Sequence, residues 1–216
     1  MSGLLILGAA GDGKVVAEVA LDLAAQGEGP TPVGFLDDRL PPGTLCHGLP
    51  VVGGLAQWRN AAPDTQFVAA LHKIKQMVGR CALIESLGIP SDRWATVIHP
   101  TARIARYVKV GAGSFIAQYV VVQPGASIGR HVSIRAGANI GHDARVGDFA
   151  YIGPNASLCG TAEMAHAAHL GPNGVIVEGV SVGEYSVVGV ASAVTKHIGP
   201  RRVVFGTPAR FVGGVD

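Results

Sequence analysis

The 216-residue chain has little of what marks several common classes of protein. Its three cysteines, Cys46, Cys81 and Cys159, are scattered without metal-type spacing, so we expect free thiols in a reducing, cytoplasmic compartment. The formal net charge is only +2, which gives no reason to expect binding to nucleic acid or to a membrane. No apolar run approaches membrane-spanning length, and the stretch 4–7 is too short for a signal peptide.

What the chain does have is a sequence period of six. From Ile98 to Val194 every sixth residue is aliphatic or Met, in one unbroken register: Ile98, Ile104, Val110, Ile116, Val122, Ile128, Ile134, Ile140, Val146, Ile152, Leu158, Met164, Leu170, Ile176, Val182, Val188 and Val194. Four residues after each of these, up to Ser192, stands only Ala, Val, Ser or Gly. Such a short, sustained period indicates a β-helix, a solenoid whose repeats stack on a shared core.

The same pattern predicts where each coil bends. On a straight strand the second residue after each aliphatic one would face the core, yet this position holds Arg106, Arg130, His142, Asp148 and Glu184, among others. Burying unpaired charges is too costly, so we expect the chain to turn there and these side chains to point outward. The next position often holds a residue that tolerates left-handed backbone: Gly113, Gly125, Gly137, Asp143, Asn155, Asn173 and Gly179.

The first 95 residues follow a different pattern. Apolar stretches at 4–7, 33–36 and 67–71 are expected to be strands, and helical spacing is seen over 15–25 and 74–87. This alternation predicts a small parallel α/β domain of the Rossmann type. We therefore expect three parts: a small α/β domain over 1–95, for which the family resemblance given below implies nucleotide-sugar binding, a β-helix over 96–198 and a C-terminal cap over 199–216.

A glycine-rich turn separates the first strand from the first helix. With Gly8, Gly13 and Lys14 it nearly matches a P-loop, but Val15 stands where a Ser or Thr would be needed for Mg²⁺. A nucleotide-binding turn fits better, since its backbone approaches a phosphate at a helix N-terminus and an acidic residue follows the second strand. The candidate substrate-binding residues are Gly8, Ala10, Gly11, Asp12, Gly13, Lys14, Asp37 and Asp38. A purely structural turn with two solvated carboxylates is the alternative.

Four segments, in order along the chain, carry a resemblance to a known family. They are residues 5–18 with the glycine turn, Phe35-Leu36-Asp37-Asp38, Gly141-His142-Asp143-Ala144-Arg145-Val146-Gly147-Asp148-Phe149, and Phe205-Gly206-Thr207-Pro208-Ala209-Arg210. The chain resembles the bacterial sialic acid O-acetyltransferase and nucleotide-sugar N-acetyltransferase family, a group of hexapeptide-repeat acyltransferases. The resemblance implies a left-handed parallel β-helix with about three six-residue steps per coil, and about five coils.

The resemblance also implies an activity. It predicts transfer of an acetyl group from acetyl-CoA to an amine or hydroxyl of a nucleotide-linked sugar, within polysaccharide biosynthesis, by a homotrimer whose sites lie between subunits. His142 suits the general base, because an unperturbed imidazole titrates near neutrality, and Asp143 is placed to orient its ring. Carried over by position, the coenzyme-binding residues are Tyr151, Gly160, Pro172, Val190 and Arg210. The Gly160 N–H is expected to serve the oxyanion.

Two positions depart from the family pattern. Asp12 replaces the usual His of the glycine turn and would set a carboxylate near a phosphate, and Tyr151 replaces a His that contacts the acetyl thioester. These departures leave a non-catalytic β-helical scaffold or an inactive homologue as the alternative function. The basic residues Lys196, Arg201, Arg202 and Arg210 could meet the phosphates of the coenzyme or form a solvated cap.

Three histidines in the β-helix region are candidate metal ligands. His131, His166 and His169 invite comparison with the β-helical carbonic anhydrases, but the residues that accompany such a zinc site in that family do not follow. We therefore expect no metal, and a direct attack of the acceptor on the thioester, since no Cys or Ser is paired with a base.

Overall fold

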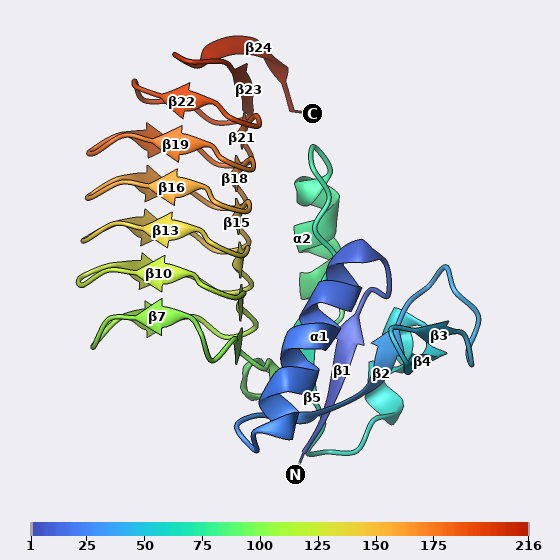
Figure 1. Ribbon diagram of the computed structural model, residues 1–216. Helices are drawn as coiled ribbons and strands as arrows, with labels where there is room; N and C mark the ends of the chain where they lie inside the picture. Colours follow the sequence, from blue (N-terminus) through green and yellow to red (C-terminus); the bar gives the residue numbers. More distant parts are fainter. Residues whose placement is uncertain (1, 216) are drawn as a thin grey trace.

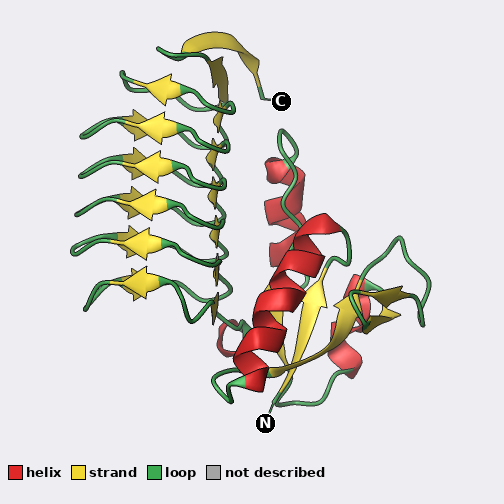
Figure 2. Ribbon diagram, viewed as in Figure 1, coloured by secondary structure: helices red, strands yellow, loops and turns green. Residues whose placement is uncertain are grey.

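The computed structural model describes residues 2–215. An α/β domain comes first, and a stack of short parallel strands follows it to the C-terminus (Figures 1 and 2). The expected fold class, an α/β domain followed by a parallel β-helix, is thus confirmed. Among the described residues no helix is long and apolar enough to cross a membrane.

The α/β domain is built on one five-stranded sheet in the order β3-β4-β2-β1-β5. Its elements are β1 (Gly3–Leu7), α1 (Gly11–Ala25), β2 (Thr31–Leu36), β3 (Leu45–Cys46), β4 (Leu49–Gly53), η1 (Leu55–Asn60), β5 (Gln66–Ala69), α2 (Met77–Ser86) and η2 (Ser91–Arg93). Strand β1 pairs in parallel with both β2 and β5. The carboxyl ends of these three strands therefore meet at one edge of the sheet.

Helix α1 begins at Gly11, four positions before the expected start at Val15. The glycine turn itself forms the first helical turn, and it does so because Gly13 lacks a side chain. A Cβ on Gly13 would lie 2.0 Å from the carbonyl oxygen of Gly8. The short pair β3 and β4 is not foreshadowed by periodicity, because Pro41, Pro42 and Gly43 indicate only a loop there.

The β-helix has three flat faces. Face 1 contains β6 (Val97–Ile98), β9 (Phe115–Ile116), β12 (Ser133–Ile134), β15 (Tyr151–Ile152), β18 (His169–Leu170) and β21 (Val187–Val188). Face 2 contains β7 (Arg103–Ile104), β10 (Val121–Val122), β13 (Asn139–Ile140), β16 (Ser157–Leu158), β19 (Val175–Ile176) and β22 (Ala193–Val194). Face 3 contains β8 (Lys109–Val110), β11 (Ser127–Ile128), β14 (Arg145–Val146), β17 (Glu163–Met164) and β20 (Ser181–Val182).

Strand partners on each face are eighteen residues apart, as in the pair Val121 and Asn139. One coil therefore contains three six-residue steps, and the stacked strands are seen side by side in Figure 1. We name the bends between faces corner 1/2, corner 2/3 and corner 3/1; in one coil these are residues 135–138, 141–144 and 147–150. Corner 2/3 lies opposite face 1.

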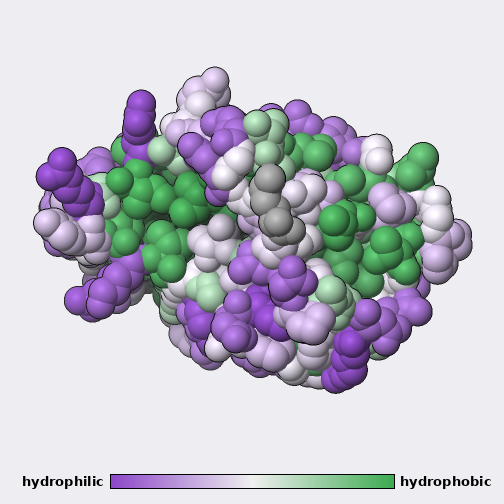
Figure 3. All heavy atoms as spheres, turned by 90° about the horizontal axis from the view of Figure 1, so that it is seen from below, coloured by the Kyte–Doolittle hydropathy of each residue, from purple (hydrophilic) through white to green (hydrophobic). Residues whose placement is uncertain are grey.

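The inward assignment of the six-residue pattern is confirmed. The aliphatic residues from Ile116 to Val194 are buried in one cluster together with small partners such as Ala144, Ala150 and Ala156. The first members, Ile98, Ile104 and Val110, are only half-buried because no coil lies beneath them. Figure 3 shows hydrophobic surface over this end of the β-helix.

The corners are left-handed, as predicted from their Gly, Asn and Asp residues. The structure extends this to residues with no such preference, including Tyr107, Tyr119, Phe149 and Ala167, which have φ of 68°, 58°, 60° and 52°. Left-handed backbone is unfavourable for residues with a Cβ, so stacking of the coils dictates the corner and overrides local preference.

The α/β domain packs on face 1. Phe115 and Ala117 of that face are buried in one cluster with Ile6 and Val16. At the far end, β23 (Arg202–Phe205) extends face 1 in parallel with β21, and β24 (Arg210–Gly214) folds back on β23 in antiparallel fashion. The α/β domain, with its glycine turn, is therefore fixed against face 1, away from corner 2/3.

Candidate active site

His142 and Asp143 form a hydrogen-bonded pair at corner 2/3. The Nδ1 atom of His142 lies 3.0 Å from Oδ2 of Asp143, although neighbouring side chains usually diverge. The left-handed backbone of Asp143, with φ of 58°, brings the two together. Backbone bonds to the adjacent coils hold the corner, from Asp143 N–H to the Pro124 carbonyl and from Thr161 N–H to the His142 carbonyl. With Nδ1 donating to the carboxylate, Nε2 keeps a free lone pair.

Gly160 lies one coil beyond His142 at the same corner. A Cβ built on Gly160 would be 2.5 Å from Nε2 of His142. The imidazole therefore lies directly over the bare backbone of Gly160, whose N–H is the expected oxyanion donor.

The glycine turn is held by a buried carboxylate. Oδ2 of Asp37 accepts the N–H of Ala9 at 2.9 Å, and Oδ1 accepts the N–H of Arg39 at 2.8 Å. Burial raises the pKa of Asp37, but the N–H bonds from Ala9 and Arg39 and the charge of Arg39 outweigh it, so the pKa is lowered. Both oxygens of Asp37 are thus engaged within the protein.

Asp38 is placed differently from its neighbour. Its Oδ1 accepts the N–H of Leu55 at 2.7 Å, at the start of η1, while the residue itself is exposed. Of the two carboxylates, Asp38 is the exposed one, and it lies just after the carboxyl end of β2.

An open groove of about 360 Å³ lies beside the glycine turn. The turn contributes Gly8, Ala10, Gly11 and Asp12, and three cations line the same groove: Arg39, Lys73 and Arg80. Lys14, which the near-P-loop spacing singles out, is exposed and is not among the lining residues. Sequence reasoning missed these three cations because they lie on separate segments: Arg39 follows β2, Lys73 follows β5 and Arg80 lies on α2. The position of Arg39 and Lys73 after parallel strands is the signal that could have found those two.

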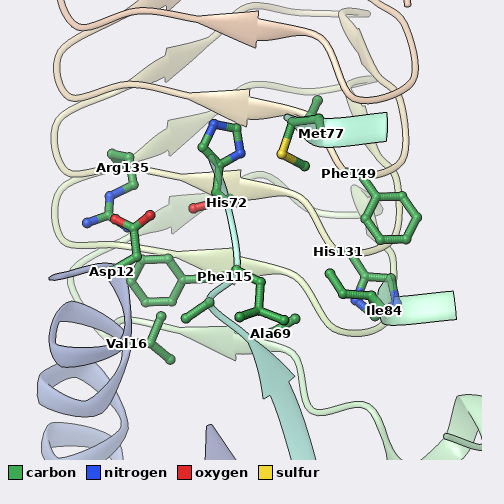
Figure 4. Close-up of a pocket in the computed structure, with 14 residues that line it drawn as sticks. Asp12, Val16, Ala69, His72, Met77, Ile84, Phe115, His131, Arg135 and Phe149 are labelled. Atoms are coloured by element: carbon green, nitrogen blue, oxygen red, sulfur yellow. The ribbon is translucent and has the colours of Figure 1, made fainter. Parts of the chain in front are cut away.

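Asp12 does not stand as a lone negative charge. Its Oδ1 lies 3.2 Å from Nη1 of Arg135, whose side chain is 10% exposed. The guanidinium of Arg135 also lies over the ring of Phe115, 5.6 Å from its centre. Figure 4 shows the carboxylate and guanidinium facing each other across the junction between α1 and face 1. The positive charge of Arg135 offsets the negative charge of Asp12, which would otherwise repel a phosphate.

Tyr151 is enclosed in an aromatic stack on face 1. Its ring lies 4.2 Å from that of His72 and 4.6 Å from that of His169, centre to centre, and Nε2 of His72 lies 3.0 Å from Nδ1 of His169. Burial lowers the pKa of His72 to about 3 and that of His169 to about 4. Both imidazoles are therefore neutral near pH 7, and burial raises the pKa of Tyr151.

The remaining candidate coenzyme residues lie elsewhere. Pro172 and Val190 stack at corner 1/2, where the Ala191 N–H donates to the Pro172 carbonyl and Val190 is 56% exposed. Arg210 begins β24 and is exposed. One chain thus does not bring these residues together with Gly160 and His142, which occupy a different corner.

The histidines weighed for a metal site do not converge. His131 stacks on Phe149, His166 meets Phe149 and Tyr185 edge to face, and His169 lies in the Tyr151 stack. Over residues 2–215 no group of three or more His, Cys, Asp or Glu side chains could hold a metal ion.

Comparison with known proteins agrees with this architecture. Residues 3–75 match the PglD N-terminal domain, and residues 107–142 and 125–160 match the bacterial transferase hexapeptide model. Over 56 residues the chain is 41% identical to a dTDP-3-amino-3,6-dideoxy-alpha-D-galactopyranose 3-N-acetyltransferase of Aneurinibacillus thermoaerophilus. That match spans 26% of this chain and 29% of the enzyme.

Two solved structures match the chain almost from end to end. The acetyltransferase domain of PglB from Neisseria gonorrhoeae FA1090, in complex with acetyl coenzyme A, is 28% identical with a TM-score of 0.84, over 97% of this chain and 98% of that one. PerB from Caulobacter crescentus, in complex with CoA and GDP-perosamine, is 29% identical with a TM-score of 0.82, over 99% and 98%.

These matches define a class. The chain contains hexapeptide repeats and a PglD-type N-terminal domain, and its homologues are nucleotide-sugar N-acetyltransferases. The family resemblance found in the sequence is confirmed, and the relatives hold the coenzyme that it implied.

Proposed function

We propose that this protein transfers the acetyl group of acetyl-CoA to the amino group of a nucleotide-linked sugar. The observation that carries the proposal is the His142–Asp143 pair, with Nδ1 and Oδ2 3.0 Å apart, on a chain that matches a perosamine N-acetyltransferase of Caulobacter crescentus over 99% of its length. An amine acceptor is favoured over a hydroxyl because the Aneurinibacillus relative is a 3-N-acetyltransferase and the Caulobacter crescentus relative is a perosamine N-acetyltransferase.

The nucleotide-sugar is proposed to bind in the groove beside the glycine turn. Lys73, Arg80 and Arg39 supply positive charge there, and the N-terminus of α1 adds backbone N–H groups and the positive end of its dipole. Asp38 is the carboxylate available to a ribose hydroxyl. Arg135 offsets the negative charge of Asp12, so that Asp12 does not repel the diphosphate.

The chemical step follows from the orientation of His142. The neutral amine attacks the thioester carbonyl carbon, and Nε2 takes a proton from the amine nitrogen as the N–C bond forms. The Gly160 N–H is proposed to stabilise the oxyanion. When the C–S bond breaks, the imidazolium returns its proton to the leaving sulfur, giving the amide and free coenzyme A. Asp143 keeps the ring orientated and stabilises its charged form.

A second copy of the chain is proposed to complete the site. The groove lies on the face 1 side, whereas His142 lies at corner 2/3, opposite that face. A homotrimer in which the groove and corner 1/2 of one subunit meet corner 2/3 of the next would join them, with Tyr151, Pro172, Val190 and Arg210 contributing to the coenzyme site. Light scattering should give three times the 22.1 kDa of one chain; a monomer at micromolar concentration would contradict the shared site.

The three parts of the chain then have separate tasks. Residues 1–95 bind the nucleotide-sugar, 96–198 bind acetyl-CoA and provide the base, and 199–216 cap the last coil. Since acetyl-CoA and nucleotide-activated sugars are cytoplasmic metabolites, we place the protein in the cytoplasm.

The proposal is tested by coenzyme release. A panel of nucleotide-linked amino sugars is incubated with the protein and acetyl-CoA, and free thiol is followed over time. Acetylation of one of them, confirmed by a mass increase of the sugar, is the expected result. If no amino sugar in the panel is acetylated while the protein still binds nucleotide-sugar, the scaffold alternative is favoured.

A further inference from the structure

Asp143 rests directly on the backbone of Gly125. Gly125 lies one coil below Asp143 at corner 2/3, and the two have φ of 77° and 58°. A Cβ on Gly125 would lie 2.1 Å from Oδ1 and 3.0 Å from Cγ of Asp143. The carboxylate therefore occupies the space that any other residue at position 125 would fill.

The imidazole of His142 is accommodated in the same way on the other side. A Cβ on Gly160 would lie 2.5 Å from Nε2, 2.7 Å from Cε1 and 3.0 Å from Cδ2 of His142. The two side chains thus sit in a slot between coils, with Gly125 beneath the acid and Gly160 against the base. We call this space, bounded by Gly125 and Gly160, the dyad slot.

The dyad slot matters because little else holds the two side chains. They are 52% and 64% exposed, and within residues 2–215 the bond between Nδ1 and Oδ2 is the one side-chain hydrogen bond that either makes. Their rotamers are therefore set by packing on the neighbouring coils, and an added methyl group at position 125 would displace the carboxylate.

We propose that Gly125 is a positioning residue for acetyl transfer, because it leaves the space in which Asp143 orients His142. The inference rests on the proposed function. Filling the space turns the Asp143 carboxylate away from Nδ1, so that the imidazole loses the partner that fixes its tautomer. The substrate and coenzyme do not touch Gly125 in this account, so kcat should fall while both KM values stay unchanged.

A purely conformational role predicts a different result, and Gly179 separates the two. Gly179 lies at the same corner with φ of 71°, but a Cβ there would meet only Oγ1 of Thr161, at 3.8 Å. Gly179→Ala therefore introduces the same left-handed strain as Gly125→Ala, without touching the pair. Gly125→Asn is a second variant that tolerates left-handed backbone yet still carries a Cβ, should Gly125→Ala fold poorly.

The kinetic test is a double-mutant cycle between Gly125 and Asp143. Gly125→Ala and Asp143→Gly should each lower kcat by about 10- to 100-fold, the range expected for a misplaced catalytic group. The double variant should be no slower than Asp143→Gly alone, because the methyl group then has nothing to displace. A kcat for Gly125→Ala equal to wild type, an equal loss in Gly179→Ala, or a further loss in the double variant would overturn the proposal.

A readout without substrate keeps the proposal separate from the proposed function. In protein labelled with ¹⁵N-histidine, the His142 resonances, assigned with His142→Asn, report which ring nitrogen carries the proton. Gly125→Ala and Gly125→Asn should shift them, and Gly179→Ala should not. An unchanged His142 spectrum in both Gly125 variants would contradict the positioning role, whether or not the wild-type protein acetylates a sugar.

Discussion

The carboxylate of Asp12 and the guanidinium of Arg135 lie 3.2 Å apart and join the glycine turn to face 1 of the β-helix. The first belongs to the start of α1 and the second follows β12, more than a hundred residues later. The pair neutralises a negative charge beside the proposed phosphate groove and fixes the α/β domain on the β-helix. It therefore links substrate binding to the packing of the two parts.

Removing one member of this pair should be costly. Arg135→Met is expected to lower the free energy of unfolding by about 1–3 kcal/mol, since it leaves a half-buried carboxylate without its partner. It should also raise the KM for the nucleotide-sugar, because Asp12 then faces the diphosphate uncompensated. Denaturant unfolding and steady-state kinetics measure the two effects. In Asp12→Asn/Arg135→Met most of the lost stability should return; a double variant less stable than Arg135→Met would contradict the assignment.

The cations that line the groove should matter more for substrate binding than Lys14, the lysine of the near-P-loop motif. Lys73→Ala and Arg80→Ala should each raise the KM for the nucleotide-sugar by about tenfold, which corresponds to the loss of one charge-assisted contact of about 1.4 kcal/mol. The KM for acetyl-CoA should not change. Lys14→Ala, which removes the near-P-loop lysine outside the groove, should have a smaller effect. A larger effect of Lys14→Ala than of either groove variant would place the phosphates elsewhere.

The stability of the protein should fall in mild acid. Burial lowers the pKa of His72 to about 3 and that of His169 to about 4, whereas an imidazole in the unfolded chain titrates near 6.5. Below pH 6.5 the two imidazoles bind protons in the unfolded state but not in the folded state. Their contribution to stability is therefore fully present above pH 6.5 and is lost as the pH falls toward 3. At pH 5 each buried histidine should cost about 2 kcal/mol.

Melting temperatures measured between pH 7 and pH 4 test this dependence. His72→Phe/His169→Phe should flatten the decline, because it removes both imidazoles and their mutual hydrogen bond together. Tyr151→Phe keeps both histidines and should retain the slope. An undiminished slope in the double histidine variant would show that other groups cause the acid instability.

The inner register of the β-helix should tolerate no extra volume. Ala150 is 1% exposed and faces the core beside the aliphatic series. Ala150→Leu is expected to destabilise the protein by about 1–3 kcal/mol through overpacking. Ser127→Leu, at an exposed position of β11, serves as the control and should leave the melting temperature nearly unchanged. Equal melting temperatures for wild type and Ala150→Leu would be incompatible with the packing described above.

The fold could be predicted from the sequence because the β-helix is encoded by a six-residue period. The series from Ile98 to Val194 states which residues face inward, and corner residues such as Gly125 and Asp143 state where the chain bends. The early start of α1 was not readable, because it depends on the contact between Gly13 and the Gly8 carbonyl, which exists only once β1 is in place. Tyr107 and Phe149 adopt left-handed backbone against their own preferences because the stacking of the coils imposes the corner.

The candidate site was only partly readable. The adjacent pair His142–Asp143 and the glycine turn are local in the sequence, and a motif can show them. Arg135 beside Asp12, His72 on Tyr151 and the groove cations Lys73 and Arg80 are brought together by tertiary packing. The spacing of these residues does not predict the contacts. The first two depend on how the α/β domain is docked on face 1, and the groove cations depend on the packing of β5 and α2 beside the glycine turn.

The role of His142 is tested most directly by the turnover of His142→Asn. With the amino sugar identified by coenzyme release, kcat of this variant should fall by roughly 10²–10⁴-fold, because general-base assistance is lost. The melting temperature and the binding of nucleotide-sugar and acetyl-CoA should be retained, since the side chain lies outside the core at an exposed corner. Asp143→Asn should cost less, because it removes orientation and leaves the base. A His142→Asn enzyme within a few-fold of wild type would contradict the mechanism.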